Sequence, residues 1–150
     1  MFRDVERHYV ETARVGRLAT ADADGRPSAV PICFALVDSH IVTPVDEKPQ
    51  RVSPDRLRRS RDIRENPRVT LVVDHYTEDW TRLGWVQIRG TAMHCSPEDD
   101  HHSPGVTALR RKYDQYADHD LEQRPLIRIA PGSVRSWGRL ERPCDDPGSP

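Results

Sequence analysis

The 150-residue sequence has few cysteines, and their spacing excludes several kinds of site. Cys33, Cys95 and Cys144 lie far apart, and no Cys-x-x-Cys pair occurs. Zinc knuckles and dithiol redox centres need such close pairs. Histidine does not supply the missing metal ligands, because His94 and Cys95 are neighbours on an expected strand and point to opposite faces. The sequence therefore predicts no metal site and no redox disulfide.

The sequence also lacks the short motifs of nucleophilic and nucleotide-binding enzymes. It contains no G-x-S-x-G, no phosphate-binding P-loop and no G-x-G-x-x-G. No apolar run approaches the roughly 20 residues that span a bilayer. The N-terminal residues carry charge from Arg3 onward, unlike a secretory signal. We expect a cytoplasmic protein with no membrane segment and no catalytic residues of its own.

A strong excess of charge of either sign is absent, since the formal net charge is −1. This balance argues against a general binder of nucleic acid or of membrane surfaces. Hydrophobic residues make up 35% of the chain and charged residues 31%, which leaves a thin core for one domain. Chains of this kind often complete their core by pairing with a copy of themselves. We therefore expect one domain and a homodimer.

The chain is dominated by strand patterns. A helix at 2–14 precedes three expected strands, the third ending near residue 45, and a helix follows at 54–66. Two strands at 68–76 and 83–95 come next, then a helix at 105–118 and a strand pair or bent strand that ends near 137. Hairpin-like links between these strands predict a mainly β fold, a small antiparallel split barrel with peripheral helices. We assign residues 1–138 to this domain and expect 139–150 to be a disordered tail.

Residues 28–37 give the clearest strand pattern, with two unlike faces. Large side chains occupy one face, namely Val30, Ile32, Phe34 and Leu36. Small side chains occupy the other, namely Ala29, Pro31, Cys33 and Ala35. The small face suits the close approach of a backbone or a flat ligand, and Pro31 indicates a position that needs no ladder hydrogen bond. Small residues that fill a tight barrel wall would give the same pattern.

Positive charge is concentrated between Thr43 and Pro67. Its members are Lys48, Arg51, Arg56, Arg58, Arg59, Arg61 and Arg64. Ser53-Pro54-Asp55 marks a helix start. The helical period places Leu57, Ser60 and Ile63 on the buried face, Arg59 and Arg61 farther out, and Arg58, Asp62 and Glu65 toward solvent. The cluster predicts an anion site, while a solvated helix with local ion pairs remains an alternative.

Three segments resemble one known superfamily: ARVGRLATADADGRPSAVPICFAL, VDEKPQR followed by LRRSRDIRENPRVTLVVDHY, and DWTRLGWVQIRGTA. Together they resemble the pyridoxamine 5′-phosphate oxidase-like superfamily of split β-barrel flavin and deazaflavin proteins. The D-x-K-P and D-H-Y-x-x-D-W-x-R-L-x-W-V segments are similar to a narrower branch of F420-dependent enzymes. The similarity covers roughly residues 10–137.

The resemblance implies a homodimer with cofactor sites in grooves between the subunits. Val30, Pro31 and Ile32 would border the cofactor ring. Basic residues after the third strand would bind its phosphate, and the segment from Trp80 to Trp85 would come from the second subunit or cap the ring. From the residues alone, these tryptophans fit a role in the core or a dimer interface as well as they fit a role beside a flat ring. The remaining candidate cofactor-binding residues are Thr43, Lys48, Arg51, Arg56 and Arg59.

The resemblance also implies an activity. The expected function is hydride transfer between the reduced deazaflavin F420 (8-hydroxy-5-deazaflavin) and a small, electron-poor substrate, with the chemistry supplied by the cofactor. F420 carries an acidic tail, so the breadth of the basic cluster favours it over FMN. An FMN-dependent oxidoreductase of the same fold and a non-catalytic cofactor-binding protein are the alternatives.

Overall fold

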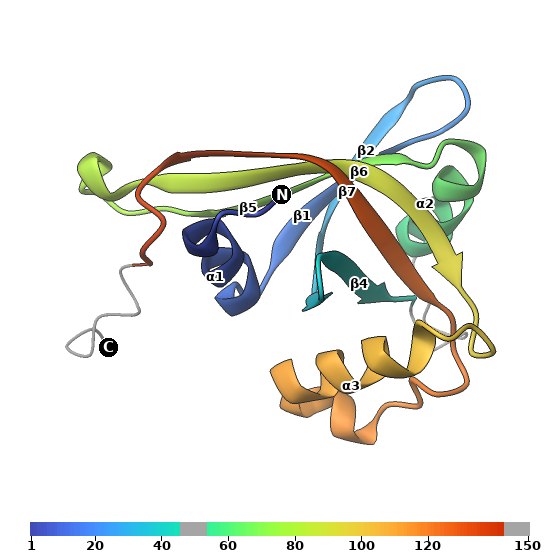
Figure 1. Ribbon diagram of the computed structural model, residues 1–150. Helices are drawn as coiled ribbons and strands as arrows, with labels where there is room; N and C mark the ends of the chain where they lie inside the picture. The colour runs from blue at the N-terminus through green and yellow to red at the C-terminus, as the bar shows by residue number, and fades with distance from the viewer. Residues whose placement is uncertain (46–53, 143–150) are drawn as a thin grey trace.

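The computed structural model describes residues 1–45 and 54–142, although the side chains of 54–57 lie outside that description. Strands predominate in it, and the helices lie around them (Figure 1). The elements are α1 (Asp4–Thr12), β1 (Gly16–Ala21), β2 (Pro27–Ile32), β3 (Ala35–Val37), β4 (His40–Pro44), α2 (Pro54–Glu65), β5 (Arg68–His75), η2 (Trp80–Arg82), β6 (Gly84–Cys95), α3 (His102–Lys112), η3 (Asp114–Asp118) and β7 (Leu126–Gly138).

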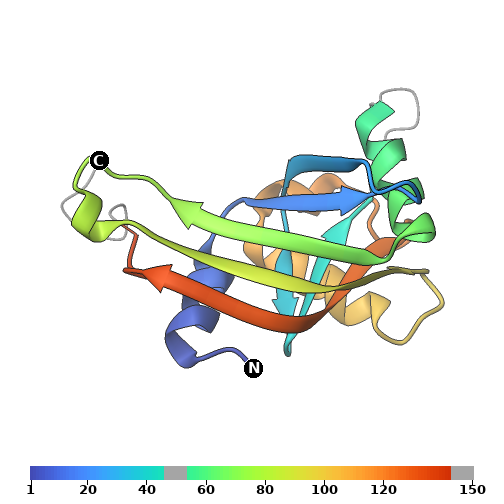
Figure 2. The same cartoon turned by 90° about the horizontal axis from the view of Figure 1, so that it is seen from above.

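The strands form one curled sheet of seven strands in the order β2-β1-β5-β6-β7-β4-β3, and every neighbouring pair is antiparallel. This half-barrel confirms the predicted mainly β split-barrel fold. In Figure 1, α1 and α3 lie beneath the long strands, and α2 lies at the end opposite the β5–β6 hairpin. Figure 2 shows the same strands from above, with α1 and α3 behind the sheet.

Two backbone features hold the strands in register. Gly25 turns the β1–β2 hairpin with φ +81°, a conformation that glycine adopts at little cost. The ladder between β6 and β7 shifts register at Arg89 and Gly90, as expected of a bulge. A Cβ at Gly90 would lie 2.4 Å from the carbonyl oxygen of Ala130, so the two strands approach too closely there for a larger residue.

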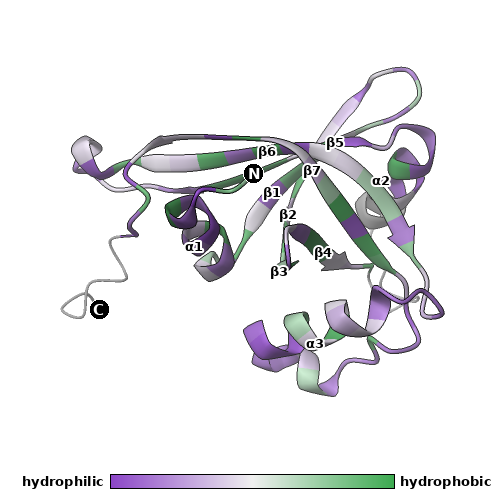
Figure 3. Cartoon of the chain, viewed as in Figure 1, coloured by the Kyte–Doolittle hydropathy of each residue, from purple (hydrophilic) through white to green (hydrophobic). Residues whose placement is uncertain are grey.

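The core lies on the concave face of the sheet. Its largest cluster includes Leu18, Phe34, Leu71, Ile88 and Ile129, all fully buried. A second cluster packs α3 against β3 and β4. Figure 3 shows hydrophobic residues along β4 and a mixture of polar and apolar residues on α1 and α3. None of the helices in the described ranges is both long and apolar enough to cross a membrane.

The single strand expected at 28–37 is two strands, which corrects the prediction. β2 ends at Ile32 and β3 begins at Ala35. Between them, the Phe34 amide donates to the Tyr113 hydroxyl at 3.1 Å, and that hydroxyl lies 3.1 Å from the Phe34 carbonyl oxygen. A side chain thus replaces the ladder partner at the break. After it, Ala35 is buried in the second cluster, instead of sharing a face with Pro31 and Cys33.

The helix expected at 54–66 is present as α2, but its buried face differs from the prediction. Ile63 is buried as expected. Asp62 was expected to face solvent, yet only 1% of it is exposed, and Arg59 is also buried. Asp62 accepts a hydrogen bond from Thr20 Oγ1 at 3.2 Å and pairs with Arg58 at 3.6 Å. A polar stripe of α2 therefore packs on the sheet, which hydrophobic periodicity does not reveal.

The C-terminal third also differs in detail from the expected elements. The helix expected at 105–118 is α3 followed by the separate turn η3, because Tyr113 adopts an extended backbone conformation. The last element is one bent strand, β7. Leu140 is buried, and the Arg142 guanidinium lies 3.8 Å from the centre of the Tyr9 ring. Residues 139–142 therefore pack against the domain, and 143–150 lie outside the described residues.

Candidate functional site

A pocket of about 250 Å³ lies where β2, β4, α2 and η3 meet. We call it the β2–β4 pocket. It unites four of the predicted cofactor-binding residues from separate segments of the chain: Pro31, Ile32, Thr43 and Arg59. The other residues that line it are Val15, Cys33, Pro44 and Tyr116.

The end of β2 forms an apolar wall of this pocket. Pro31 is exposed on β2, which is an edge strand of the sheet. Proline is tolerated there because an edge strand has backbone groups that need no partner. Ile32 is buried beneath it, and Pro44 continues the apolar surface on β4. Pro31 comes from the small face of the sequence pattern, whereas Ile32 comes from the large face.

Thr43 fixes the distance between two walls of the pocket. Its side chain is 1% exposed, and its Oγ1 donates a hydrogen bond of 2.7 Å to the Cys33 carbonyl oxygen. This bond joins β4 to the break that follows β2. The Cys33 side chain is exposed at the pocket, which leaves its thiol accessible from solvent.

Positive charge lines the pocket through Arg59, which is only 6% exposed. A buried guanidinium is costly to desolvate, and it presents a rigid fork of donors that matches carboxylate and phosphate groups. The residue therefore gives the β2–β4 pocket an electrostatic preference for an anionic group. Arg59 was predicted as a cofactor residue, although its helical position was expected to lie farther from the core.

A second cation lies behind the Cys33–Phe34 break. Lys112 Nζ is 3.9 Å from the centre of the Phe34 ring, and it has no hydrogen-bond partner among the described residues. Burial lowers the pKa of Lys112 to about 8, and the nearby Arg14 and Arg142 charges act in the same direction. Burial also raises the pKa of the neighbouring Tyr113 to about 12, so this phenol stays protonated. The phenol is then able to donate to the Arg14 carbonyl oxygen at 2.8 Å.

Not all of the predicted residues meet in this pocket. Val30 is half-buried and packs against the core. Trp80 is 70% exposed on η2, and Trp85 pairs with Trp137 across β6 and β7. The η2 turn and α2 lie at opposite ends of the sheet in Figure 1, so within one chain these tryptophans are remote from the pocket. Lys48, Arg51 and the Arg56 side chain lie outside the described residues.

Sequence reasoning missed part of the pocket. Tyr116 comes from η3 and is separated from Cys33 by more than half of the sequence of the domain. The sequence around Tyr116 showed only a helical pattern. Val15 precedes β1 and Pro44 ends β4, and neither carries a chemical signal. Cys33 was placed on the correct small face, but it was not assigned to the site.

A larger hollow of about 630 Å³ lies on the solvent face of the sheet. Strands β1, β2, β5, β6 and β7 line it near the Gly90 bulge, mainly with small side chains and the arginines Arg68 and Arg89. It contains none of the predicted cofactor residues. The hollow is therefore distinct from the β2–β4 pocket.

The histidines of the described ranges have structural partners in several places. His94 Nε2 and Ser60 Oγ are 2.7 Å apart, and burial lowers the pKa of His94. His75 lies between the Tyr9 hydroxyl (2.7 Å) and the Arg82 carbonyl oxygen (2.6 Å). Within residues 1–45 and 54–142, no group of three or more His, Cys, Asp or Glu side chains is placed to hold a metal ion.

Comparison with known proteins gives one family and one curated relative of interest. The family model described as "Pyridoxamine 5'-phosphate oxidase" matches residues 2–138. A protein of Streptomyces rimosus, named 5a,11a-dehydrotetracycline/5a,11a-dehydrooxytetracycline reductase, is 28% identical over 138 residues. That match covers 91% of this chain and 83% of the relative.

Solved structures share the fold at lower identity. A conserved hypothetical protein of Mycobacterium tuberculosis is 22% identical with a TM-score of 0.70, and the match covers 92% of this chain and 86% of the other. The Vibrio cholerae heme storage protein HutZ is 16% identical with a TM-score of 0.71, covering 91% and 95%. A protein named F420 reductase is 21% identical with a TM-score of 0.59, covering 86% and 94%.

Proposed function

The chain belongs to the pyridoxamine 5′-phosphate oxidase family, and from this premise we propose that it is an F420-dependent oxidoreductase acting on a small, electron-poor substrate. The observation that carries the proposal is the β2–β4 pocket. It joins the apolar wall of Pro31 and Ile32 to the buried cation Arg59. A flat ring with an anionic chain requires both features.

The residues of the pocket fit such a cofactor in chemistry but only partly in size. Ligand pockets usually measure roughly 300–1,000 Å³, and the β2–β4 pocket offers about 250 Å³. One chain thus supplies a wall for a large cofactor and does not enclose it. We propose that a second copy of the chain completes the site. The exposed Trp80 and the Trp85–Trp137 pair are the residues that this copy would bring.

The residues of this chain would bind and orient, while bound F420 would supply the hydride chemistry. Pro31 and Ile32 would hold the ring against β2, and Thr43 would keep that wall at a fixed distance from β4. Arg59 would bind an anionic group, with Lys48, Arg51 and Arg56 as further proposed anchors. Fixed placement of a ring beside a substrate lowers the entropic part of the barrier.

The dehydrotetracycline reductase supports the substrate class. Its named substrates are fused-ring compounds, and its sequence aligns with most of this chain. We propose that the substrate of this chain is also a ring compound, flat and poor in electrons. FMN is the alternative cofactor, since the ring wall accepts either heterocycle, and the acidic tail of F420 makes better use of the predicted basic cluster.

Binding decides between these cofactors. We would titrate the purified apo protein with F420, FMN and heme separately and follow tryptophan fluorescence. F420 should bind most tightly, and light scattering should show a dimer. Tighter binding of FMN would overturn the F420 assignment, and binding of heme alone would overturn the oxidoreductase assignment. Lys48→Ala combined with Arg51→Ala should weaken F420 binding without lowering the melting temperature.

A further inference from the structure

We propose that η3 forms the substrate side of the β2–β4 pocket and that Tyr116 positions the substrate ring there. The inference rests on the proposed function, because it assigns the wall of the pocket that the cofactor leaves open. Tyr116 lines the pocket together with Pro31 and Cys33 of the opposite wall. None of the predicted cofactor-binding residues comes from α3 or η3.

The Tyr116 ring packs edge to face against two other aromatic rings. It meets Tyr113 edge to face, with centroids 5.6 Å apart and planes at 74°. It also meets His119 edge to face, with centroids 5.4 Å apart and planes at 80°. Edge-to-face packing of this kind fixes the orientation of a ring. A ring oriented before binding loses little entropy when a flat ligand packs on it.

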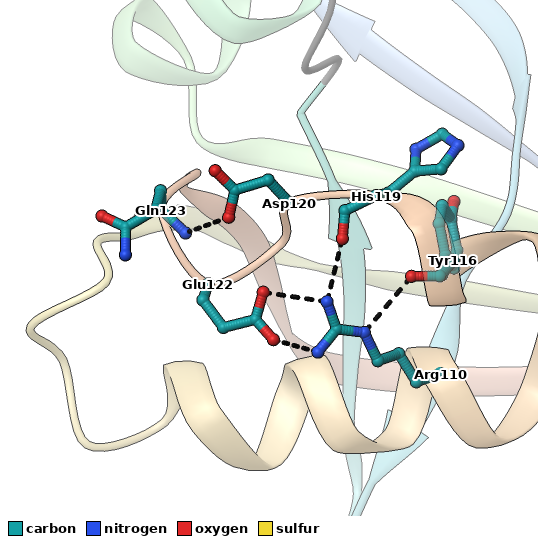
Figure 4. A network of polar contacts seen from close by, with 6 residues as sticks. All are labelled: Arg110, Tyr116, His119, Asp120, Glu122 and Gln123. Carbon is teal, nitrogen blue, oxygen red and sulfur yellow. Dashed lines mark hydrogen bonds and ion pairs between the residues drawn. The ribbon is translucent and has the colours of Figure 1, made fainter.

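The backbone that carries Tyr116 is held by Arg110, as Figure 4 shows. The Arg110 guanidinium donates from Nε to the Tyr116 carbonyl oxygen at 3.2 Å and from Nη2 to the His119 carbonyl oxygen at 2.8 Å. It also forms a two-pronged ion pair with Glu122. One side chain of α3 thereby ties both the turn η3 and the loop after it.

The ion pair stays intact over a wide range of pH. Its hydrogen bonds from Arg110 lower the pKa of Glu122 to about 2, so this carboxylate remains charged at any ordinary pH. Glu122 is exposed, however, and exposed ion pairs contribute little to global stability. The clear effect of these contacts is local: they fix the backbone on which Tyr116 sits. Arg110 and Glu122 are therefore positioning residues that act through Tyr116.

Steady-state kinetics with F420-loaded protein and 4-nitroacetophenone as the probe substrate test the inference. Tyr116→Ala should raise KM about tenfold with less than a twofold change in F420 affinity, and Tyr116→Phe should retain most of the wild-type KM because the ring remains. Arg110→Lys should raise KM by about threefold, because lysine keeps the charge but lacks the planar set of guanidinium donors. Arg111→Ala, on the exposed side of the same helix, is the matched control.

Protection of Cys33 from alkylation gives a readout independent of turnover. In a Cys144→Ser background, Cys33 is the accessible thiol, because Cys95 is buried. The probe should slow alkylation of Cys33 by iodoacetamide in F420-loaded protein, and Tyr116→Ala should abolish that protection at the same probe concentration. Absence of protection in the parent, or an unchanged KM in Tyr116→Ala, would overturn the inference. Failure to bind F420 would instead overturn the proposed function.

Discussion

Helix α2 contributes Arg59 to the pocket, and helix α3 leads into the turn η3 that contributes Tyr116, but the two helices are attached to the sheet by different chemistry. α3 packs through apolar side chains, among them Val106 and Leu109, into the second core cluster. α2 buries Asp62 and Arg59 beside Ile63, and the buried carboxylate receives a hydrogen bond from Thr20. Helix α3 is thus held mainly by the hydrophobic effect, whereas α2 is also held by specific polar contacts.

The difference matters because the two attachments do different things for the pocket. Apolar packing tolerates small shifts, since it has no preferred direction. A hydrogen-bonded carboxylate fixes a single register, because a buried polar group without its partner is costly. α2 therefore places the charge of Arg59 with little freedom. α3 provides a stable base on which Arg110 sets the more local position of Tyr116.

The largest expected effect is on the apolar attachment. Leu109→Ala should lower the free energy of unfolding by about 3 kcal/mol, because Leu109 is fully buried and its loss leaves a cavity. Urea denaturation monitored by circular dichroism measures the change. Arg111→Ala on the same helix should change it by less than about 0.5 kcal/mol. A loss below about 1 kcal/mol for Leu109→Ala would show that α3 is held in some other way.

Removal of the buried carboxylate should cost somewhat less. Asp62→Ala should destabilise the protein by about 2 kcal/mol, since it strands the Thr20 hydroxyl and removes the partner of Arg58. Asp62→Asn keeps an acceptor for Thr20 and should recover part of that loss. The same denaturation curves report both changes. Equal stability of wild type and Asp62→Ala would mean that the polar stripe does not hold α2.

The charge of Arg59 should matter more for binding than for folding. Arg59→Met keeps the length of the side chain but removes the cation, so affinity for F420 should fall by about 2 kcal/mol, or roughly 30-fold. Stability should change by less than about 1.5 kcal/mol, because Met keeps most of the buried volume of the arginine stem. Fluorescence titration measures the change in affinity, and thermal melting of the same samples measures the change in stability. An unchanged dissociation constant would remove Arg59 from the site.

The sequence predicted the local features of the fold well, and it did not predict the features that depend on a partner from another element. The order of elements and the core positions Ile32 and Phe34 follow from alternation and turn chemistry, which are local. The burial of Asp62 does not, because an acid on a helix looks solvated until its partner on another element is known. The break in the 28–37 strand could not be predicted either, because it depends on the hydroxyl of Tyr113, which lies far away in the sequence.

The pocket shows the same limit. Pro31, Ile32, Thr43 and Arg59 were predicted from the superfamily resemblance, and the structure brings them together. Tyr116 escaped prediction, because its place depends on Arg110 contacts to backbone carbonyl groups that no residue pattern records. Trp80 and Trp85 lie elsewhere in this chain, so their assignment to the site depends on the proposed second copy.

The smallest expected effect concerns pH and the cation behind the pocket. In the unfolded chain Lys112 titrates near 10.5, and in the folded protein burial lowers its pKa to about 8. Between these values the unfolded chain binds more protons, so this residue makes stability rise with pH from 8 to 10.5. Lys112→Met should therefore be more stable than wild type by about 1–2 kcal/mol at pH 7, with the difference shrinking toward pH 10.5.

Urea denaturation of both proteins at several pH values measures this difference directly, and Arg111→Met controls for an added apolar side chain on the same helix. Because effects of base on the rest of the protein are common to both, they cancel in the comparison. A difference that does not change with pH would mean that Lys112 is solvated in the folded protein. A difference that shrinks as expected would show that α3 also buries a charge, held there by the Phe34 ring. The two helices would then differ in how a buried charge is compensated: Asp62 on α2 by the Thr20 hydrogen bond and the Arg58 ion pair, Lys112 on α3 by an aromatic face.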